Sequence, residues 1–165
     1  MDTKALFEYI DSRSEDILDF LKKICSYEAT AYDKTTLDAL VEFIDEYALS
    51  LGLTTEKTVM EKCGSFLTLD INPTGEKSAV FLAHLDTVHE KGSFGATPVK
   101  IEGNKLIAPG ATDCKGGCAI ALFVLAALKS SGYKKNARLI LTTDEEVSNS
   151  LGGENEVQFF IEKTK

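Results

Sequence analysis

One histidine and four carboxylates in this chain have the residue types and the placement that a hydrolytic metal site needs. His84 and Asp86 directly follow one apolar run, Glu145 and Glu146 follow another, and Asp113 lies in a glycine-rich segment between them. Imidazole nitrogens and carboxylate oxygens bind zinc, and a further carboxylate can take a proton from activated water. Adjacent carboxylates at a strand end point in different directions, so one can bind metal while its neighbour moves the proton.

Each of these groups also has an ordinary structural explanation when it is taken alone. His84 with Asp86 fits a surface histidine beside a helix-capping carboxylate, Asp113 fits an N-cap, and the glutamate pair fits a solvated acidic turn. Their conjunction favours a shared site, because apolar runs bounded by polar residues are typical of buried strands. Ligands bind beyond the carboxyl ends of such strands in open α/β sheets. On an extended segment Asp86 also points the same way as His84 and can fix its orientation.

The elements that must position these residues follow from apolar periodicity, which predicts an α/β fold with a mostly parallel or mixed central sheet flanked by helices. Two amphipathic helical regions come first, over residues 3–25 and from Asp33 or Thr35 to Leu49, the first with an interruption where Ser12 and Glu15 fit a capping box. Strands are expected over 54–60, 65–71, 78–83 and 137–142, with a hairpin around Gly103-Asn104. A nearly all-apolar helix over 119–128 is expected to cover the sheet, and a short helix begins near Glu154.

Length and charge restrict the function further. The 165 residues form one domain or a large piece of one, and 44% hydrophobic residues are enough for a core. The net charge of −8 argues against nucleic acid and anionic membrane surfaces as partners. We expect no membrane span and no secretory signal, hence a cytoplasmic protein with reduced cysteines.

Three further features carry weaker signals. Cys114 and Cys118 stand four residues apart, which is not the spacing of a zinc knuckle or a redox pair, so they are interpreted as buried apolar residues. The segment Lys115-Gly116-Gly117 at a helix start leaves a phosphate-binding module as an alternative, although it lacks the full P-loop spacing. His89 is interpreted as a loop histidine.

Three ordered motifs together resemble a known family. They are His84-Leu85-Asp86-Thr87-Val88, then Gly110-x-x-Asp113-x-Lys115-Gly116-Gly117, then Thr143-Asp144-Glu145-Glu146. This combination is similar to the co-catalytic zinc peptidases, which include glutamate carboxypeptidase, acetylornithine deacetylase, succinyl-diaminopimelate desuccinylase, aminoacylase and tripeptidase. The glutamate carboxypeptidase branch is the most similar in appearance, and the resemblance extends over nearly the whole chain.

The resemblance implies a role for each candidate. His84 would bind one zinc ion, Glu146 the other, and Asp113 would bridge the two, with a cis peptide to Cys114 as a family feature. Glu145 would be the general base and acid, and Asp86 would orient His84. The implied activity is metal-dependent hydrolysis of amide bonds in small peptides or N-acyl amino acids, with two Zn²⁺ ions (Co²⁺ or Mn²⁺ as alternatives) and a homodimer in the full-length protein.

The chain also departs from the family pattern. Family members supply another acidic ligand a few dozen residues later, a histidine near the C-terminus, and a lid or dimerisation domain, whereas this sequence has no histidine after His89. Glu154, Glu156 and Glu162 are interpreted as a solvated helix face. We therefore expect residues 1–165 to be the N-terminal part of a zinc-peptidase catalytic domain, without the lid and the C-terminal part, binding zinc weakly and hydrolysing substrate poorly. The alternatives are a non-catalytic assembly or binding domain, or a site completed by a second chain.

Overall fold

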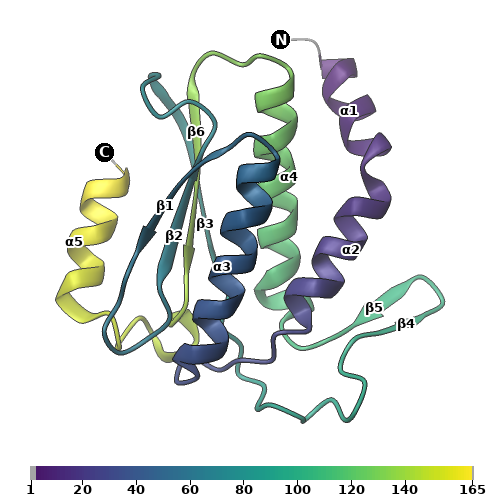
Figure 1. Ribbon diagram of the computed structural model, residues 1–165, viewed down its shortest axis with the longest axis vertical. Coiled ribbons are helices and arrows are strands. Elements are labelled where there is room, and N and C mark those ends of the chain that lie inside the picture. Colours follow the sequence, from purple (N-terminus) through teal and green to yellow (C-terminus); the bar gives the residue numbers. More distant parts are fainter. Residues whose placement is uncertain (1–2, 165) are drawn as a thin grey trace.

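The computed structural model describes residues 3–164, and its centre is a four-stranded sheet with helices on both sides (Figure 1). The strand order is β1-β2-β6-β3, with bounds β1 Thr54–Thr58, β2 Phe66–Asp70, β3 Lys77–His84 and β6 Asn136–Thr142. β3 and β6 run parallel, whereas β1 with β2 and β2 with β6 are antiparallel. Of the two expected arrangements, mostly parallel or mixed, the sheet therefore has the mixed one.

The parallel pairing of β3 and β6 determines where the segments with the candidate site residues leave the sheet. In its register His84 lies opposite Thr142. The backbone N–H of Leu85 also donates to the carbonyl of Thr142, at 2.9 Å. The residues that follow β3 and those that follow β6 therefore emerge side by side at one edge.

Five α-helices in residues 3–164 lie around the sheet. Their bounds are α1 Thr3–Ser12, α2 Ser14–Cys25, α3 Lys34–Ser50, α4 Gly116–Ser130 and α5 Gly153–Thr164. The first four lie on one side of the sheet and α5 lies on the other (Figure 1). The main core fills the space between the sheet and α2, α3 and α4, and a smaller cluster that includes Phe66, Ile140 and Phe159 lies under α5.

The helix boundaries confirm part of the expected capping. Asp33 begins α3, and its side chain accepts the N–H of Thr36 at 3.1 Å. The break between α1 and α2 falls at Arg13, close to the expected position, but the expected capping box is wrong. The Ser12 hydroxyl instead donates to the carbonyl of Tyr9, and no side chain caps α2.

The apolar helix α4 is the central helix of the core. By length and composition alone, the segment Ala111–Ser130 could cross a bilayer. Half of its most apolar stretch of 18 residues is, however, buried inside the protein. Leu122, Phe123 and Leu125 are among its buried side chains. This pattern is that of a helix covered by a sheet and by neighbouring helices.

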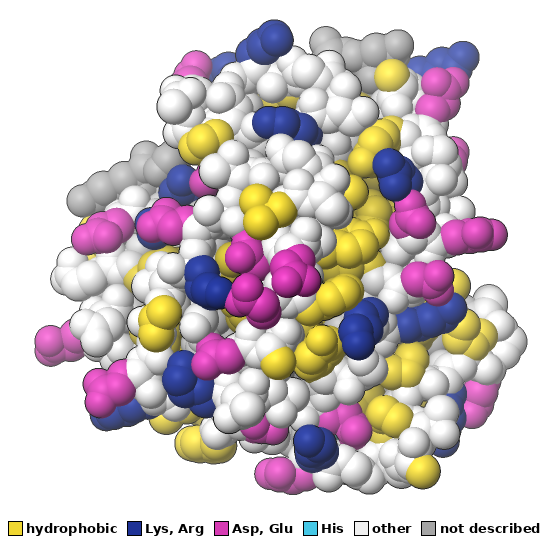
Figure 2. All heavy atoms as spheres, viewed as in Figure 1, with side chains coloured by type: hydrophobic (Ala, Val, Ile, Leu, Met, Phe, Trp, Pro, Cys, Tyr) yellow, Lys and Arg dark blue, Asp and Glu magenta, His cyan; other side chains and the backbone are white. Residues whose placement is uncertain are grey.

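A short hairpin connects β3 to α4. It consists of β4 Lys100–Glu102 and β5 Lys105–Ile107, paired antiparallel as expected. Gly103 has a φ of 61° at the turn, a conformation that glycine adopts without strain. The space-filling view along the same direction shows apolar side chains exposed in a band between the helices, among scattered charged groups (Figure 2).

Candidate metal centre

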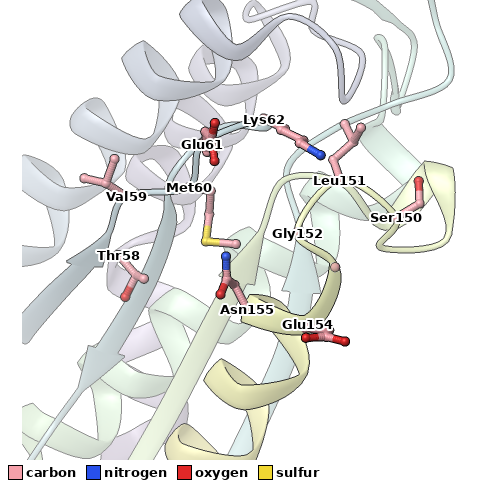
Figure 3. Close-up of a pocket in the computed structure, with 11 residues that line it drawn as sticks. Thr58, Val59, Met60, Glu61, Lys62, Ser150, Leu151, Gly152, Glu154 and Asn155 are labelled. Atoms are coloured by element: carbon pink, nitrogen blue, oxygen red, sulfur yellow. The ribbon is translucent and has the colours of Figure 1, made fainter.

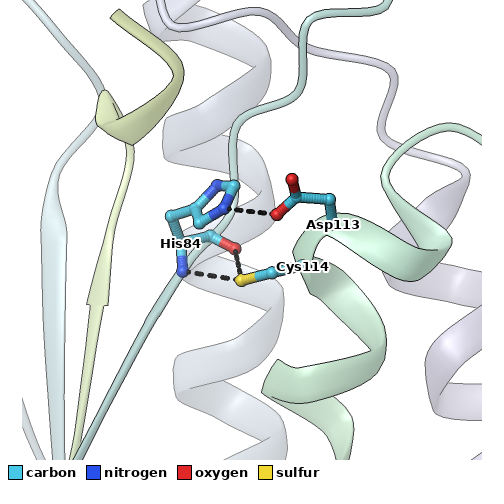
Figure 4. Close-up of side chains that lie close together, drawn as sticks. All are labelled: His84, Asp113 and Cys114. Carbon is cyan, nitrogen blue, oxygen red and sulfur yellow. Dashed lines mark hydrogen bonds and ion pairs between the residues drawn. The ribbon is translucent and has the colours of Figure 1, made fainter. Parts of the chain in front are cut away.

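His84 ends strand β3, and both of its ring nitrogens face carboxylate or carbonyl oxygens. Nδ1 lies 3.2 Å from the backbone oxygen of Asp86 and 3.3 Å from its Oδ1, whereas Nε2 lies 3.0 Å from Oδ1 of Asp113. The residue is only 6% exposed. With Nδ1 anchored on Asp86, Nε2 is the nitrogen that faces Asp113 (Figure 4).

Asp113 reaches this position from a tight segment that precedes α4. Residues Ala111–Lys115 form a kinked turn in which Asp113 and Cys114 have non-helical dihedral angles, and the Asp113–Cys114 peptide is cis, as the family resemblance implied. Gly116 is needed for this path, because a Cβ there would lie 2.6 Å from the carbonyl oxygen of Ala111. The Asp113 side chain is 76% exposed apart from its contact with His84. No side chain caps α4, so the alternative of Asp113 as an ordinary N-cap is wrong.

The turn after β6 carries Glu145 and Glu146 to the same edge. Asp86 holds this turn: its Oδ1 accepts the N–H of Glu145 at 3.3 Å and its Oδ2 accepts the N–H of Glu146 at 3.0 Å. Oε2 of Glu145 then lies 3.6 Å from Nε2 of His84. Asp86 is fully buried, so one carboxylate fixes both the imidazole and the glutamate turn.

Two open pockets meet at these side chains. They have volumes of about 320 and 290 Å³, and both include Asp113 in their walls. Glu146 and His89 line the first, and His84 and Glu145 line the second. The five predicted site residues are thus brought together, with Asp86 beneath and the other four accessible from the pockets.

Electrostatics at the site follow from this crowding of acids around one imidazole. Burial raises the pKa of Glu146, the charge of His84 opposes this, and Asp113 and Asp86 raise it further. Burial lowers the pKa of His84, but the hydrogen bonds with Asp86 and Cys114 outweigh it and raise the value to about 11. These partners favour the protonated imidazole, and a metal ion would have to displace that proton in order to bind.

Cys114 is close to His84 and Asp113 but faces the other side of the histidine. His84, Asp113 and Cys114 form a group whose ligand atoms lie within 4.8 Å of one another. The thiol, however, contacts the backbone of His84, accepting its N–H at 3.1 Å and donating to its carbonyl at 3.4 Å (Figure 4). Cys118 donates to the same carbonyl at 3.2 Å. The interpretation of Cys114 and Cys118 as buried apolar residues therefore misses that both thiols hold the backbone of His84 in place. The spacing of four residues, which puts both thiols on one helix face, was the feature of the sequence that could have indicated this.

Lys115 does not support a phosphate-binding loop. Its side chain is fully buried, and Nζ donates to the carbonyl of Tyr27 at 2.7 Å. Burial also lowers the pKa of the ammonium group. The phosphate-binding alternative is therefore wrong, because this cation is occupied inside the core.

The largest described pocket, of about 560 Å³, lies between residues 58–62 and residues 150–155 (Figure 3). Its walls include Met60, Lys62 and Glu154, and none of the five predicted site residues lines it. The candidate chemistry is therefore confined to the two smaller pockets at the sheet edge.

Comparison with known proteins identifies the peptidase family to which this chain belongs. The model of Peptidase family M20/M25/M40 matches residues 80–163, which is more than half of the chain. The chain therefore belongs to this peptidase family, and the recognition made from the three motifs is confirmed.

Similar sequences include Carboxypeptidase G2 of Pseudomonas sp. (strain RS-16), 29% identical over 158 residues, which cover 93% of this chain and 38% of that protein. Succinyl-diaminopimelate desuccinylase of Rickettsia felis is 26% identical over 159 residues, covering 88% of this chain and 40% of that protein. The chain thus spans about two fifths of the length of these relatives.

Solved structures share the fold. Human carnosine dipeptidase 1 has a TM-score of 0.79 at 20% identity, covering 95% of this chain and 37% of that chain. The metallo-carboxypeptidase Sso-CP2 from Sulfolobus solfataricus has a TM-score of 0.76 at 19% identity, covering 90% of this chain and 35% of that chain. These likenesses confirm the α/β fold.

Proposed function

We propose that this chain contributes His84, Asp113 and Glu146 as metal ligands and Glu145 as general base and acid to a peptidase or deacylase. The substrate class would be small peptides or N-acyl amino acids. The observation that carries the proposal is the convergence of an imidazole and two carboxylates, with Nε2 of His84 3.0 Å from Asp113 and 3.6 Å from Glu145. A relative named as a carboxypeptidase and another named as a desuccinylase support the substrate class.

The donor set fits zinc. A nitrogen and carboxylate oxygens are borderline and hard ligands that zinc accepts, and cobalt or manganese would also bind them. Asp86 provides the anchoring of the imidazole that a zinc-bound histidine needs, because it lies 3.3 Å from the nitrogen that faces away from Asp113. When bound, zinc supplies the Lewis acidity that activates water and polarises an amide carbonyl.

Glu145 has the position for proton transfer. Its side chain is 54% exposed and lines the pocket that also contains His84 and Asp113. Its carboxylate would take a proton from the attacking water and return it to the nitrogen of the leaving amine. Glu146, whose carboxylate lines the adjoining pocket, remains available as a ligand.

The complete two-metal site would draw on more than these residues. His84, Asp113 and Glu146 are fewer than two four-coordinate ions require. Since residues 1–165 span about two fifths of the relatives, we propose that they are part of a catalytic domain and that they bind zinc weakly by themselves. A cytoplasmic location and a homodimer of the full-length protein belong to the same proposal.

Zinc titration with a competing chelator tests the proposal. The variant His84→Ala should lose zinc binding, whereas His89→Ala removes the other histidine of the sequence, which lines the adjoining pocket but is not a proposed ligand, and should retain it. His89→Ala should keep the unfolding transition of the parent, whereas His84→Ala should still unfold cooperatively but at a lower temperature, because it loses the contacts of the imidazole with Asp86 and Asp113. Equal zinc binding in His84→Ala and the parent would contradict the assignment, and absence of binding in the parent would favour the non-catalytic alternative.

A further inference from the structure

Glu156 in α5 is buried, so the expectation of a solvated acidic face is wrong for this residue. It is 1% exposed, whereas Glu154 and Glu162 of the same helix are exposed. Its carboxylate lies directly beneath Gly152, where a Cβ would come within 2.6 Å of Oε2. A fully buried glutamate is rare without a partner, so its surroundings need an explanation.

The partner is a second buried carboxyl group, Asp144. Asp144 is fully buried, and its Oδ2 accepts the N–H of Leu151 at 3.1 Å and that of Gly152 at 2.9 Å. Its Oδ1 has no donor among the described residues, and neither has either oxygen of Glu156. The two carboxyl groups are within hydrogen-bonding reach of each other. Two buried carboxylates in contact cannot both carry a charge without a large cost.

The hydrogen bonds show which group keeps the proton. Asp144 accepts two backbone N–H groups, and such donors stabilise its ionised form. Glu156 receives no donor in the described part of the chain, so its neutral form is the stable one. A proton on Glu156 can then be donated to the free Oδ1 of Asp144, which gives a partner to two of the three unsatisfied oxygens.

We propose that Glu156 is a neutral carboxylic acid hydrogen-bonded to Asp144, and that this pair is a positioning device for the turn that carries Glu145 and Glu146. The geometry gives the reason. Asp144 immediately precedes Glu145 and Glu146 in the sequence, and its carbonyl closes their turn by accepting the N–H of Asn149 at 2.9 Å. The pair thus ties α5 to the segment at the sheet edge. The second half of the inference rests on the proposed function, since that function assigns the roles of Glu145 and Glu146.

The groups around Glu156 agree with a retained proton. Burial raises its pKa to about 8, and the neighbouring Asp144 and Asp86 act in the same direction. The thiol of Cys63, on the segment before β2, also faces these carboxyl groups, and burial raises its pKa to about 11, so it stays neutral and cannot offset the charge of an ionised Glu156. Ionised Glu156 would therefore repel Asp144 and push against the turn.

The first test concerns the proton itself and uses Glu156→Gln, with Glu154→Gln as the exposed control on the same helix. The infrared band of a protonated carboxylic acid should be present in the parent at about pH 6 and disappear as the pH rises through the pKa of Glu156. It should be missing from Glu156→Gln at every pH and unchanged in Glu154→Gln. A parent spectrum at about pH 6 that matches that of Glu156→Gln would overturn the proposal.

Thermal unfolding gives an independent measure of the same proton. Because the pKa of Glu156 is about 8 when folded and 4.5 as its ordinary value, the folded state binds more protons between these values. The contribution of Glu156 to the stability of the parent must therefore fall as the pH rises through this window and level off above it. Glutamine does not titrate and keeps a donor for Asp144, so the difference between the two stability curves should show this slope. Parallel curves would contradict the inference.

The second test concerns positioning and compares zinc affinity over the same pH range. Below the pKa of Glu156, the parent and Glu156→Gln should bind zinc equally within about threefold, but at about pH 9.5 the parent should be weaker by about tenfold. A purely structural effect of the substitution would leave the ratio the same at every pH and would overturn the positioning role. If the parent binds no zinc, the proposed function fails, while the infrared and unfolding results still decide whether the pair shares a proton.

Discussion

Replacing Asp86 with asparagine should weaken both the fold and the metal site, because one carboxylate holds two segments. Its oxygens accept the N–H groups of Glu145 at 3.3 Å and Glu146 at 3.0 Å, and Oδ1 also lies 3.3 Å from Nδ1 of His84. Asparagine has the same shape but only one acceptor oxygen. Its amide nitrogen must therefore face a backbone N–H or the protonated imidazole, and at least one buried donor loses its partner.

The expected magnitudes follow from that single lost acceptor. Leaving one buried donor unsatisfied costs about 1–3 kcal/mol. For a chain of 165 residues, a loss of about 2 kcal/mol lowers the melting temperature by about 4–8 °C. Releasing the imidazole and the glutamate turn should also weaken zinc binding by about 10–100-fold, the usual effect of removing a residue that orients a metal-bound histidine.

The control is Asp38→Asn, which changes a comparable anchor in another part of the molecule. Oδ1 of Asp38 accepts the backbone N–H of Ser65 at 2.7 Å and its hydroxyl at 2.9 Å. This variant should lose stability while keeping the zinc affinity of the parent, measured by chelator competition and by thermal unfolding. Unchanged zinc affinity in Asp86→Asn would refute the reasoning that Asp86 orients the site.

Four further outcomes are expected, three at the site and one at Gly152. Glu145→Gln should retain zinc but reduce any measured hydrolysis of dipeptides or N-acyl amino acids by about 10²–10⁴-fold, because only the proton acceptor is removed; loss of zinc instead would reassign Glu145 as a ligand. Zinc binding at neutral pH should release about one proton from His84, whose pKa is raised to about 11 when its folded partners are present, and calorimetry in buffers of different ionisation enthalpy should detect it. By the same linkage, the metal-free protein should lose stability as the pH rises towards that value, since folding favours the protonated imidazole. Gly152→Ala should lower the free energy of unfolding by about 1–3 kcal/mol, because the new Cβ would lie 2.6 Å from Oε2 of Glu156, and a denaturation midpoint equal to that of the parent would contradict this packing.

Most of the fold could be predicted because local patterns and tertiary packing agree. The run 79–83 is apolar throughout, and the structure pairs it in parallel with β6. Asp33 was one of two candidate caps for α3 and is the one used. The capping box at Ser12 failed for a local reason, because its hydroxyl bonds back to Tyr9 and satisfies a carbonyl instead of a free N–H.

The site could be predicted only where the chemistry lies at strand ends. His84 and Glu145 were identifiable because each comes at or after the end of an apolar strand, and the structure places them together. The expectation that both strands are buried holds for β6 but is wrong for β3, because β3 lies at the edge of the sheet and its Val80 and Leu82 are exposed. The burial of Glu156 was not predictable, because its partner Asp144 lies twelve positions earlier and glutamates on short polar helices are usually solvated. The burial of Lys115 was not predictable for a similar reason, because the carbonyl that its Nζ contacts belongs to Tyr27, 88 positions away.

The parallel arrangement of β3 and β6 is what makes the candidate site possible. Among the described strands of the central sheet, this is the parallel pair, and it supplies His84 from one strand and the Glu145–Glu146 turn from the other. Had the two strands paired antiparallel, their carboxyl ends would lie at opposite edges of the sheet, and no side chain as short as that of Asp86 could reach both segments. Because the N–H groups of Glu145 and Glu146 both meet Asp86, strand direction and a single buried carboxylate together fix the relative position of the proposed base and ligands.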